Sequence, residues 1–153
     1  LTEAGGFARC AVNIKRGQFL PPWAMAQAAE KVRAAGNKKI LLTERGSCFG
    51  YADLVVDFRS VVIMRKFGYP VVLDATHSVQ MMYADQVSGG QPEFIPALAR
   101  AAVAVGVDGL FMEVHENPAA AKSDAATQFP LCELESLLQR LVAMHDMARK
   151  SQG

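Results

Sequence analysis

The stretch VVLDATHS, residues 71–78, decides how the chain is expected to fold. Its first four residues form an almost continuous apolar run that is too short for a helix, which is typical of a strand buried on both faces of a parallel sheet. The polar residues that follow, ending with His77 and Ser78, form a tip at the carboxyl end of this strand. The same unit, an apolar run, a polar tip and an amphipathic segment, recurs along the chain.

These recurring units predict alternating strands and helices. Strands are predicted at residues 11–14, 40–43, 71–74 and 110–113. Helices are predicted between Pro22 and Gly36, between Leu54 and Gly68, between Phe94 and Gly106, and from Leu134 onward, because apolar residues recur there at helical spacing. No linker interrupts the pattern, so we expect a single α/β domain over residues 1–153.

The length of the repeat narrows the architecture. A strand and helix every roughly 30 to 35 residues fits a doubly wound sheet or a (βα)₈ TIM barrel. The sequence has no glycine-rich dinucleotide fingerprint and no P-loop, which favours the barrel. Four strands make half of a barrel with open edges, so we interpret the chain as the last four βα units. We expect the N-terminal half-barrel to come from sequence before Leu1 or from a partner chain.

Composition excludes several classes of function. The 153 residues are 51% hydrophobic and 20% charged, with a formal net charge of +1, so no broad basic field indicates nucleic-acid binding. Apolar stretches fall well short of the roughly 20 residues that a membrane span needs. Cys10, Cys48 and Cys132 are far apart and have no CxxC spacing, so we interpret them as free thiols in a reducing cytoplasm.

Two cations are expected to bind an anion. Lys15 and Arg45 each lie at or just past the carboxyl end of a predicted strand, and in a barrel these ends converge on one mouth. Converging positive charge suits a phosphate or carboxylate, and Arg16 adds a second cation beside Lys15. The alternatives are a solvated lysine and a local ion pair between Arg45 and Glu44.

A second group of side chains suits a metal ion. His77, Glu113 and Asp124 follow the third and fourth predicted strands and offer one imidazole nitrogen and two carboxylates, a set suited to Zn²⁺, Fe²⁺ or Mn²⁺. The alternative for His77 is a hydrogen-bonded structural residue or a proton shuttle. His115 and His145 are not expected to take part. Residues 88–90 are interpreted as a flexible loop over the mouth or a mobile surface loop.

Five motifs in order resemble the 3-deoxy-8-phosphooctulonate synthase family. They are NIKRGQF (13–19), ERGSCFGY (44–51), DATHSVQ (74–80), SGG (88–90) and FMEVH (111–115). The resemblance implies condensation of phosphoenolpyruvate with D-arabinose 5-phosphate and water. It also implies a homotetramer and no organic cofactor. The nearest alternatives are a 3-deoxy-arabino-heptulosonate 7-phosphate synthase and a non-catalytic half-barrel subunit.

The resemblance also assigns roles to residues. It implies that Lys15 and His77 are catalytic, that Lys15, Arg45 and His77 bind phosphoenolpyruvate, and that His77, Glu113 and Asp124 bind a divalent metal. The family's fourth ligand, a cysteine, would precede this sequence. The string SDAATQ at 123–128 resembles the metal-dependent branch. Arg16 stands where a second lysine is common, and the MMY at 81–83 and the QP at 91–92 depart from the family's loop.

Overall fold

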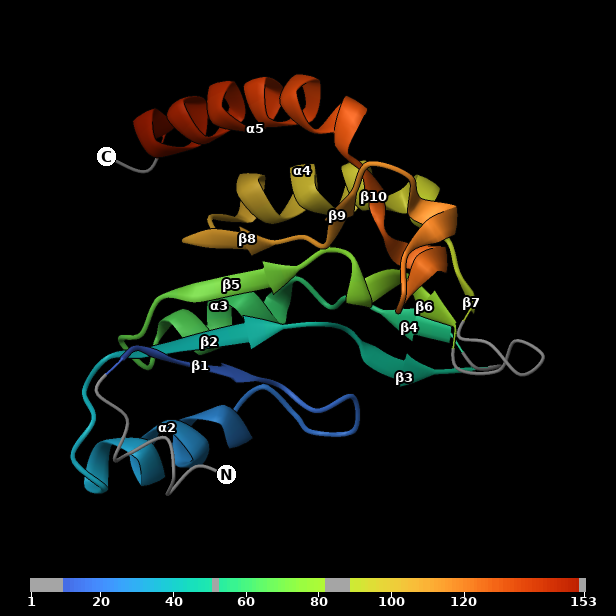
Figure 1. Ribbon diagram of the computed structural model, residues 1–153. Helices are drawn as coiled ribbons and strands as arrows, with labels where there is room; N and C mark the ends of the chain where they lie inside the picture. The colour runs from blue at the N-terminus through green and yellow to red at the C-terminus, as the bar shows by residue number, and fades with distance from the viewer. Residues whose placement is uncertain (1–9, 51–52, 82–88, 152–153) are drawn as a thin grey trace.

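A parallel sheet forms the centre of the computed structural model, which describes residues 10–50, 53–81 and 89–151. Its four strands lie side by side in the order of the chain (Figure 1): β1 (Val12–Lys15), β2 (Ile40–Glu44), β5 (Val71–Asp74) and β8 (Gly109–Phe111). Each overlaps a predicted strand, so the α/β class is confirmed. The fourth strand ends at Phe111, so Glu113 lies beyond the strand and not within it.

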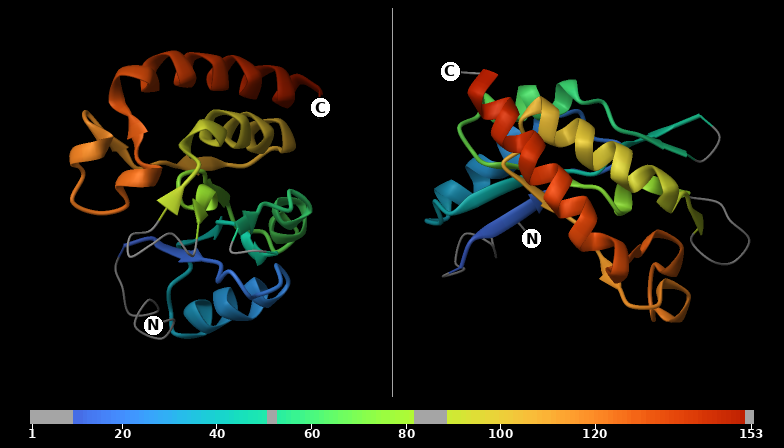
Figure 2. Two further views of the ribbon diagram at one scale, coloured as in Figure 1. Left: turned by 90° about the vertical axis from the view of Figure 1, so that its right-hand side faces the viewer. Right: turned by 90° about the horizontal axis from the view of Figure 1, so that it is seen from above.

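Three helices cover one face of this sheet, and Figure 2 shows them along the same side. They are α2 (Ala24–Ala34), α3 (Arg59–Arg65) and α4 (Ile95–Val105), and α5 (Leu131–Ser151) packs along α4. Gly106 ends α4 at φ 97°, a left-handed conformation that a side chain disfavours. A doubly wound sheet has helices on both faces and a reversal of strand order, and neither is present in the described residues.

The two faces of the sheet differ in polarity. Leu42 and Leu73 point to the helices and are fully buried, as expected for alternation along a strand. On the other face Leu41 and Val72 are only half-buried. The core therefore lies between the sheet and its helices. The opposite face carries Lys15, which ends β1, and Asp74, which ends β5.

The predicted helix between Leu54 and Gly68 is wrong in its first part. Leu54 lies in β4 (Asp53–Val55), which pairs antiparallel with β3 (Ser47–Phe49). The helix begins only at Arg59, where a carboxylate oxygen of Asp57 accepts its backbone N–H at 3.0 Å. A single buried leucine fits strand or helix equally well, and the Asp57 turn separates the two elements.

Short elements extend the carboxyl ends of the strands. They are η1 (His77–Val79), β6 (Gln80–Met81), β7 (Gly89–Gly90), η2 (Pro92–Phe94), β9 (Val114–His115), η3 (Pro118–Ala120), η4 (Ala125–Thr127) and β10 (Phe129–Pro130). β6 pairs antiparallel with β7, and β10 pairs parallel with β9. Gly89 and Gly90 thus belong to a strand and not to a flexible loop, while Ser88 lies outside the described residues. Phe94, predicted to start a helix, is the N-cap of α4.

The structure also bears on the predictions about cysteines and membrane spans. The three cysteines are free thiols, as predicted. None of the helices in the described part of the chain has the length and hydrophobicity that a membrane crossing requires.

A buried ion pair holds together the segments that follow β1 and β2. The Arg16 guanidinium, 2% exposed, donates from Nε and Nη2 to the two oxygens of Glu44, at 2.8 and 2.5 Å. Its other N–H groups donate to Ser47 Oγ and to the backbone oxygens of Gly17 and Leu20, so all five donors have acceptors. The expectation that Arg16 helps to bind an anion is therefore wrong, because its donors are all occupied inside the protein.

Replacing Arg16 by alanine leaves the Glu44 carboxylate buried without its counterion. We expect Arg16→Ala to lower the free energy of unfolding by roughly 3 to 5 kcal/mol, measured by urea denaturation. The matched control is Arg33→Ala, which removes an exposed pair with Glu30 on α2 and should leave the urea midpoint nearly unchanged. An equal shift in both variants would contradict a structural role for the buried pair.

Candidate functional site

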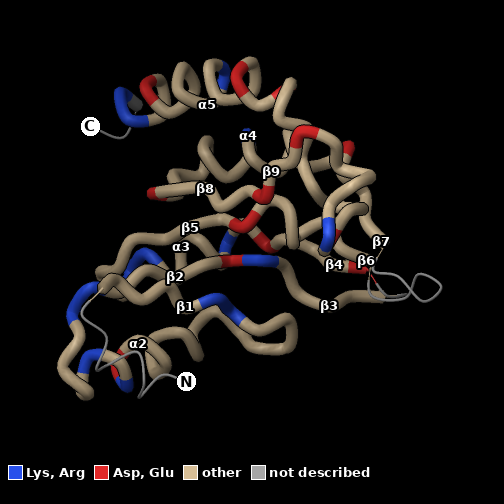
Figure 3. The backbone as a smooth tube through the Cα atoms, in the orientation of Figure 1, with Lys and Arg blue, Asp and Glu red and all other residues tan. Residues whose placement is uncertain are grey.

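The strand-end side chains that the sequence singled out lie together. Lys15 ends β1, Arg45 directly follows β2, His77 begins η1 just after β5, and Glu113 follows β8. Charged residues of both signs gather around these strand ends in Figure 3. The predicted convergence is thus confirmed as geometry, because carboxyl ends of parallel strands meet at one edge.

The buried carboxylate of Asp74 joins two of these residues. Its Oδ2 accepts a hydrogen bond from Lys15 Nζ at 2.5 Å and lies 2.8 Å from His77 Nδ1. Its Oδ1 accepts the backbone N–H of His77 at 2.9 Å and the Thr76 hydroxyl at 3.2 Å. Lys15 Nζ also lies 4.7 Å from the centre of the Phe111 ring, a cation–π contact. Sequence analysis did not select Asp74, although an acid that ends an apolar strand was a usable signal.

The pKa of Asp74 reflects these contacts. Burial opposes its ionisation, but hydrogen bonds from His77 and Lys15 outweigh that effect, and the pKa of the carboxyl lies below its ordinary value. An ionised Asp74 accepts a hydrogen bond from Nδ1–H of His77, and in the neutral imidazole this leaves the lone pair of Nε2 free. The imidazole is thereby oriented for a ligand on its other side.

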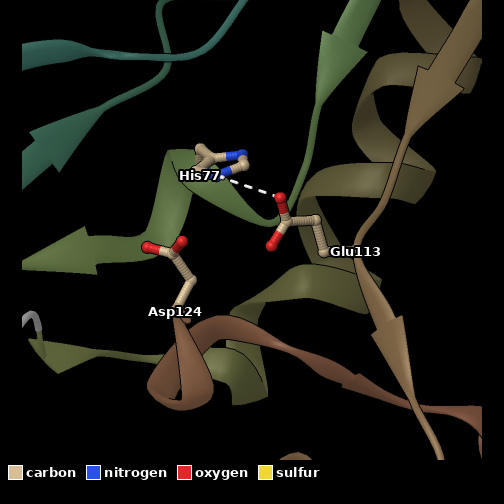
Figure 4. Close-up of side chains that lie close together, drawn as sticks. All are labelled: His77, Glu113 and Asp124. Carbon is tan, nitrogen blue, oxygen red and sulfur yellow. Dashed lines mark ion pairs between the residues drawn. The ribbon is translucent and has the colours of Figure 1, made fainter. Parts of the chain in front are cut away.

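That other side faces the predicted metal-binding group. His77 Nε2 lies 3.5 Å from Glu113 Oε1, and Figure 4 shows His77, Glu113 and Asp124 converging from three segments. One ligand atom from each residue lies within 4.8 Å of the others. A nitrogen and two carboxylate oxygens at this spacing fit a borderline divalent ion. A hollow of about 500 Å³ opens beside Glu113.

Backbone geometry places Asp124 in this group. Asp124 has φ 50°, the only positive φ at a non-glycine position in the described residues, and aspartate tolerates it better than most side chains. Its backbone oxygen accepts the N–H of Thr127 at 2.9 Å. Gly90 of β7 packs so closely that an added Cβ would lie 2.4 Å from the Thr127 side chain. A glycine at position 90 is therefore required next to the Asp124 turn.

Arg45 lies beside the same group and has unused hydrogen-bonding capacity. Its Nη2 donates to Gln80 Oε1 at 2.7 Å and to the backbone oxygen of His77 at 3.2 Å. Its Nε is buried and has no partner among the described residues. Burial lowers the pKa of Arg45, while nearby Asp74 opposes that shift. An ion pair of Arg45 with Glu44 is not formed, because the Glu44 carboxylate pairs with Arg16 and reaches only the backbone N–H of Arg45.

Two glutamines complete the site, and sequence analysis missed their roles. Gln80 Nε2 donates to Asp124 Oδ1 at 2.8 Å, and Gln128 Nε2 donates to Glu113 Oε2 at 2.7 Å. Each carboxylate of the metal-binding group is thus held by one neutral amide.

His115 and His145 were not expected to take part. His115 accepts the backbone N–H of Asn117, and His145 lies on α5.

Comparison with known proteins gives consistent results. Residues 1–150 match the family model described as the DAHP synthetase I family. The 2-dehydro-3-deoxyphosphooctonate aldolase of Trichlorobacter lovleyi is 56% identical over 139 residues, 90% of this chain and 51% of the relative. Proteins of the same name from Cyanothece sp. and Legionella pneumophila are 59% and 56% identical, over 87% and 91% of this chain and 49% and 51% of the relatives. The chain spans about half the length of these curated relatives.

The lowered pKa of Asp74 makes its contribution to stability depend on pH. An unfolded aspartate titrates near about 3.9, so the stabilisation is present above that value and is lost as pH falls through the lower folded pKa. We expect the stability difference between the natural chain and Asp74→Asn to be largest above about pH 5 and to shrink below about pH 4. Unfolding measured from pH 3 to 7 tests this, with exposed Asp146→Asn as control. A difference independent of pH would contradict the role of the Asp74 charge.

Proposed function

Because this chain belongs to the DAHP synthetase I family, we propose that it forms the C-terminal half of a 3-deoxy-8-phosphooctulonate synthase. Such an enzyme condenses phosphoenolpyruvate with D-arabinose 5-phosphate and water, giving 3-deoxy-D-manno-octulosonate 8-phosphate and inorganic phosphate. The observation that carries the proposal is one connected network. Arg45 donates a hydrogen bond to the backbone oxygen of His77, and Lys15 is connected to His77 through Asp74. His77 in turn lies beside Glu113.

The cations of this network suit the phosphoenolpyruvate dianion. The buried Nε of Arg45 has no partner within the part of the chain that the structure describes, and such a donor favours an anionic acceptor. The Lys15 side chain is 40% exposed and, among residues 10–50, 53–81 and 89–151, donates one hydrogen bond, to Asp74, so its other N–H groups are proposed to bind substrate. Fixed cations orient the substrate and stabilise the negative charge that develops on it.

The reaction requires phosphoenolpyruvate, the aldehyde and a water molecule to be held in a fixed relative orientation. C3 of phosphoenolpyruvate bonds to the aldehyde carbon, and the aldehyde oxygen takes up a proton. Water adds to C2, and as phosphate leaves with the oxygen that joined it to C2, the added hydroxyl loses its proton and becomes the C2 carbonyl. In the proposed site Lys15 and Arg45 hold the phosphoenolpyruvate, and His77 lies between these cations and the two carboxylates. Asp74 keeps the imidazole in one orientation.

A divalent ion, Zn²⁺, Fe²⁺ or Mn²⁺, is proposed for His77, Glu113 and Asp124. The donor atoms fit such an ion, and each ligand is held by an outer partner: Asp74 for His77, Gln128 for Glu113 and Gln80 for Asp124. A bound ion supplies positive charge and a fixed template for the reacting groups. The chain's own residues fix the direction from which each ligand atom approaches.

The sheet supports the proposal of a TIM barrel completed by four further βα units. In the described part of the chain the helices lie on one face of the sheet, and β1 and β8 are its outer strands. A groove of about 720 Å³ along α5 is lined partly by the exposed side chains of Leu131, Leu138 and Val142. The family resemblance further supports a cytoplasmic homotetramer as part of this proposal.

Activity requires both halves under this proposal. We expect a chimera of the N-terminal half of the Trichlorobacter lovleyi relative with this chain to release phosphate from phosphoenolpyruvate when D-arabinose 5-phosphate is present. Arg45→Ala should slow release by roughly 10² to 10³-fold, since it removes a charge from the reacting anion. Exposed Arg100→Ala on α4 is the charge-matched control.

Two results would overturn the assignment. One is phosphate release with erythrose 4-phosphate as fast as with arabinose 5-phosphate, which would indicate a 3-deoxy-arabino-heptulosonate 7-phosphate synthase. The other is turnover by the 153-residue chain alone, which we expect to be inactive because half of the proposed barrel would be absent.

Metal binding is tested separately from activity. We expect the chain to bind one Mn²⁺ in a calorimetric titration, and His77→Ala or Glu113→Gln to abolish that binding, because each removes one of the proposed protein ligands. His145→Ala and Glu116→Gln, which change the same residue types outside the group, should leave it unchanged. Equal Mn²⁺ affinity in all four variants would place the ion elsewhere.

A further inference from the structure

The amide of Gln80 lies between two opposite charges. Its Oε1 accepts a hydrogen bond from Arg45 Nη2 at 2.7 Å, and its Nε2 donates to Asp124 Oδ1 at 2.8 Å. The charges fix the orientation of the amide, because the reversed amide would turn its NH₂ toward the guanidinium and its oxygen toward the carboxylate. Gln80 therefore satisfies a cation and an anion at once and neutralises neither.

We propose that Gln80 is a positioning residue that keeps Arg45 and Asp124 from forming a direct ion pair. This inference rests on the proposed function, in which Arg45 serves the substrate anion and Asp124 the metal ion. Arg45 and Asp124 are both half-buried, where a guanidinium and a carboxylate attract each other more strongly than in water, and their preferred contact is bidentate. Such a contact would occupy the oxygens that a metal ion needs and cancel the charge that an anion needs.

The surrounding structure supports this role. Gln80 lies on β6, which pairs with β7, and Gly90 of β7 packs against the turn that carries Asp124. The Gln80–Asp124 contact thus joins two parts of one tightly packed unit. Arg45 comes from the end of β2 and reaches this unit through its long side chain. Its Nε has no partner among the residues that the structure describes, so we expect the guanidinium to move toward a carboxylate if the amide is removed.

Gln128 provides a natural comparison. It holds the other carboxylate of the group, Glu113, by the same kind of hydrogen bond, at 2.7 Å. Its side chain has no cation partner in the described residues and otherwise reaches only the backbone oxygen of Ser123. Removing the Gln128 amide loosens a metal ligand without releasing a cation. Comparing variants of the two glutamines therefore distinguishes two effects. One is loss of ligand orientation, and the other is pairing of a ligand with Arg45.

The experiment measures Mn²⁺ affinity of the chain by calorimetry, so it does not depend on catalysis. Gln80→Leu and Gln128→Leu should each weaken binding by roughly 10- to 100-fold, as loss of an outer partner of a metal ligand does. Arg45→Ala is then added to the natural chain and to both variants. If Arg45 captures Asp124 when Gln80 is absent, Arg45→Ala should restore affinity in the Gln80→Leu chain by roughly 3- to 100-fold more than it changes the natural chain. In the Gln128→Leu chain it should give no such recovery.

Thermal unfolding of each variant verifies that it is folded, and Gln80→Met, of similar size and also without an amide, replaces Gln80→Leu if that variant is unfolded. An equal effect of Arg45→Ala in the natural and Gln80→Leu chains would overturn the separating role and leave Gln80 as an ordinary ligand partner. Unchanged Mn²⁺ affinity in Gln80→Leu would also overturn it. Absence of Mn²⁺ binding by the natural chain would overturn the metal assignment of the proposed function together with this inference.

Discussion

The buried carboxylate of Asp74 is the contact on which the arrangement of the site depends. It lies at the end of β5, yet it binds Lys15 from β1, two strands away, since β2 lies between them. Neighbouring strands are about 4.8 Å apart, so the Lys15 side chain has to cross over β2 to reach Asp74. Thr43, the partner of Lys15 in the β1–β2 register, is small enough to let it pass. The sheet register and the Asp74 charge together determine where Lys15 and His77 lie.

Lys15 and Arg16 are adjacent in the chain but have different roles, because side chains alternate between the faces of a strand. Lys15 points to the site, while Arg16 is buried in its pair with Glu44. Glu44 also accepts the backbone N–H groups of Arg45 and Gly46, so this pair shapes the segment that carries Arg45. The Arg16–Glu44 pair is structural, and all N–H donors of Arg16 have acceptors. Arg45, which lies beside this pair, keeps a donor without a partner in the described residues. The sequence NIKRGQF alone does not distinguish the two, because Lys15 and Arg16 are equally plausible cations for an anion.

Periodicity predicted the sheet and its helices well, and the short elements between them poorly. The apolar runs located all four strands of the sheet, and the polar residues after them located Lys15, Arg45, His77 and Glu113. Leu54 was misplaced because one apolar residue fits either period, and its pairing with Cys48 across β3 and β4 decides its place. Gln80 and Gln128 were missed because a neutral amide has no charge pattern or motif, and its role appears only when its partners lie beside it. Completion of the barrel stays a prediction.

The site brings together two parts of the chain. Lys15, Arg45 and His77 belong to the main sheet and η1, whereas Glu113 and Asp124 belong to the segment that contains β9, η4 and β10. The segment is attached near the sheet by the Thr76 hydroxyl, which accepts the Glu113 backbone N–H at 3.2 Å. The ligand atoms of His77, Glu113 and Asp124 all lie within 4.8 Å of one another, with His77 Nε2 at 3.5 Å from Glu113 Oε1. The amides of Gln80 and Gln128 each hold one carboxylate of this group, so they fix the directions from which Asp124 and Glu113 face His77.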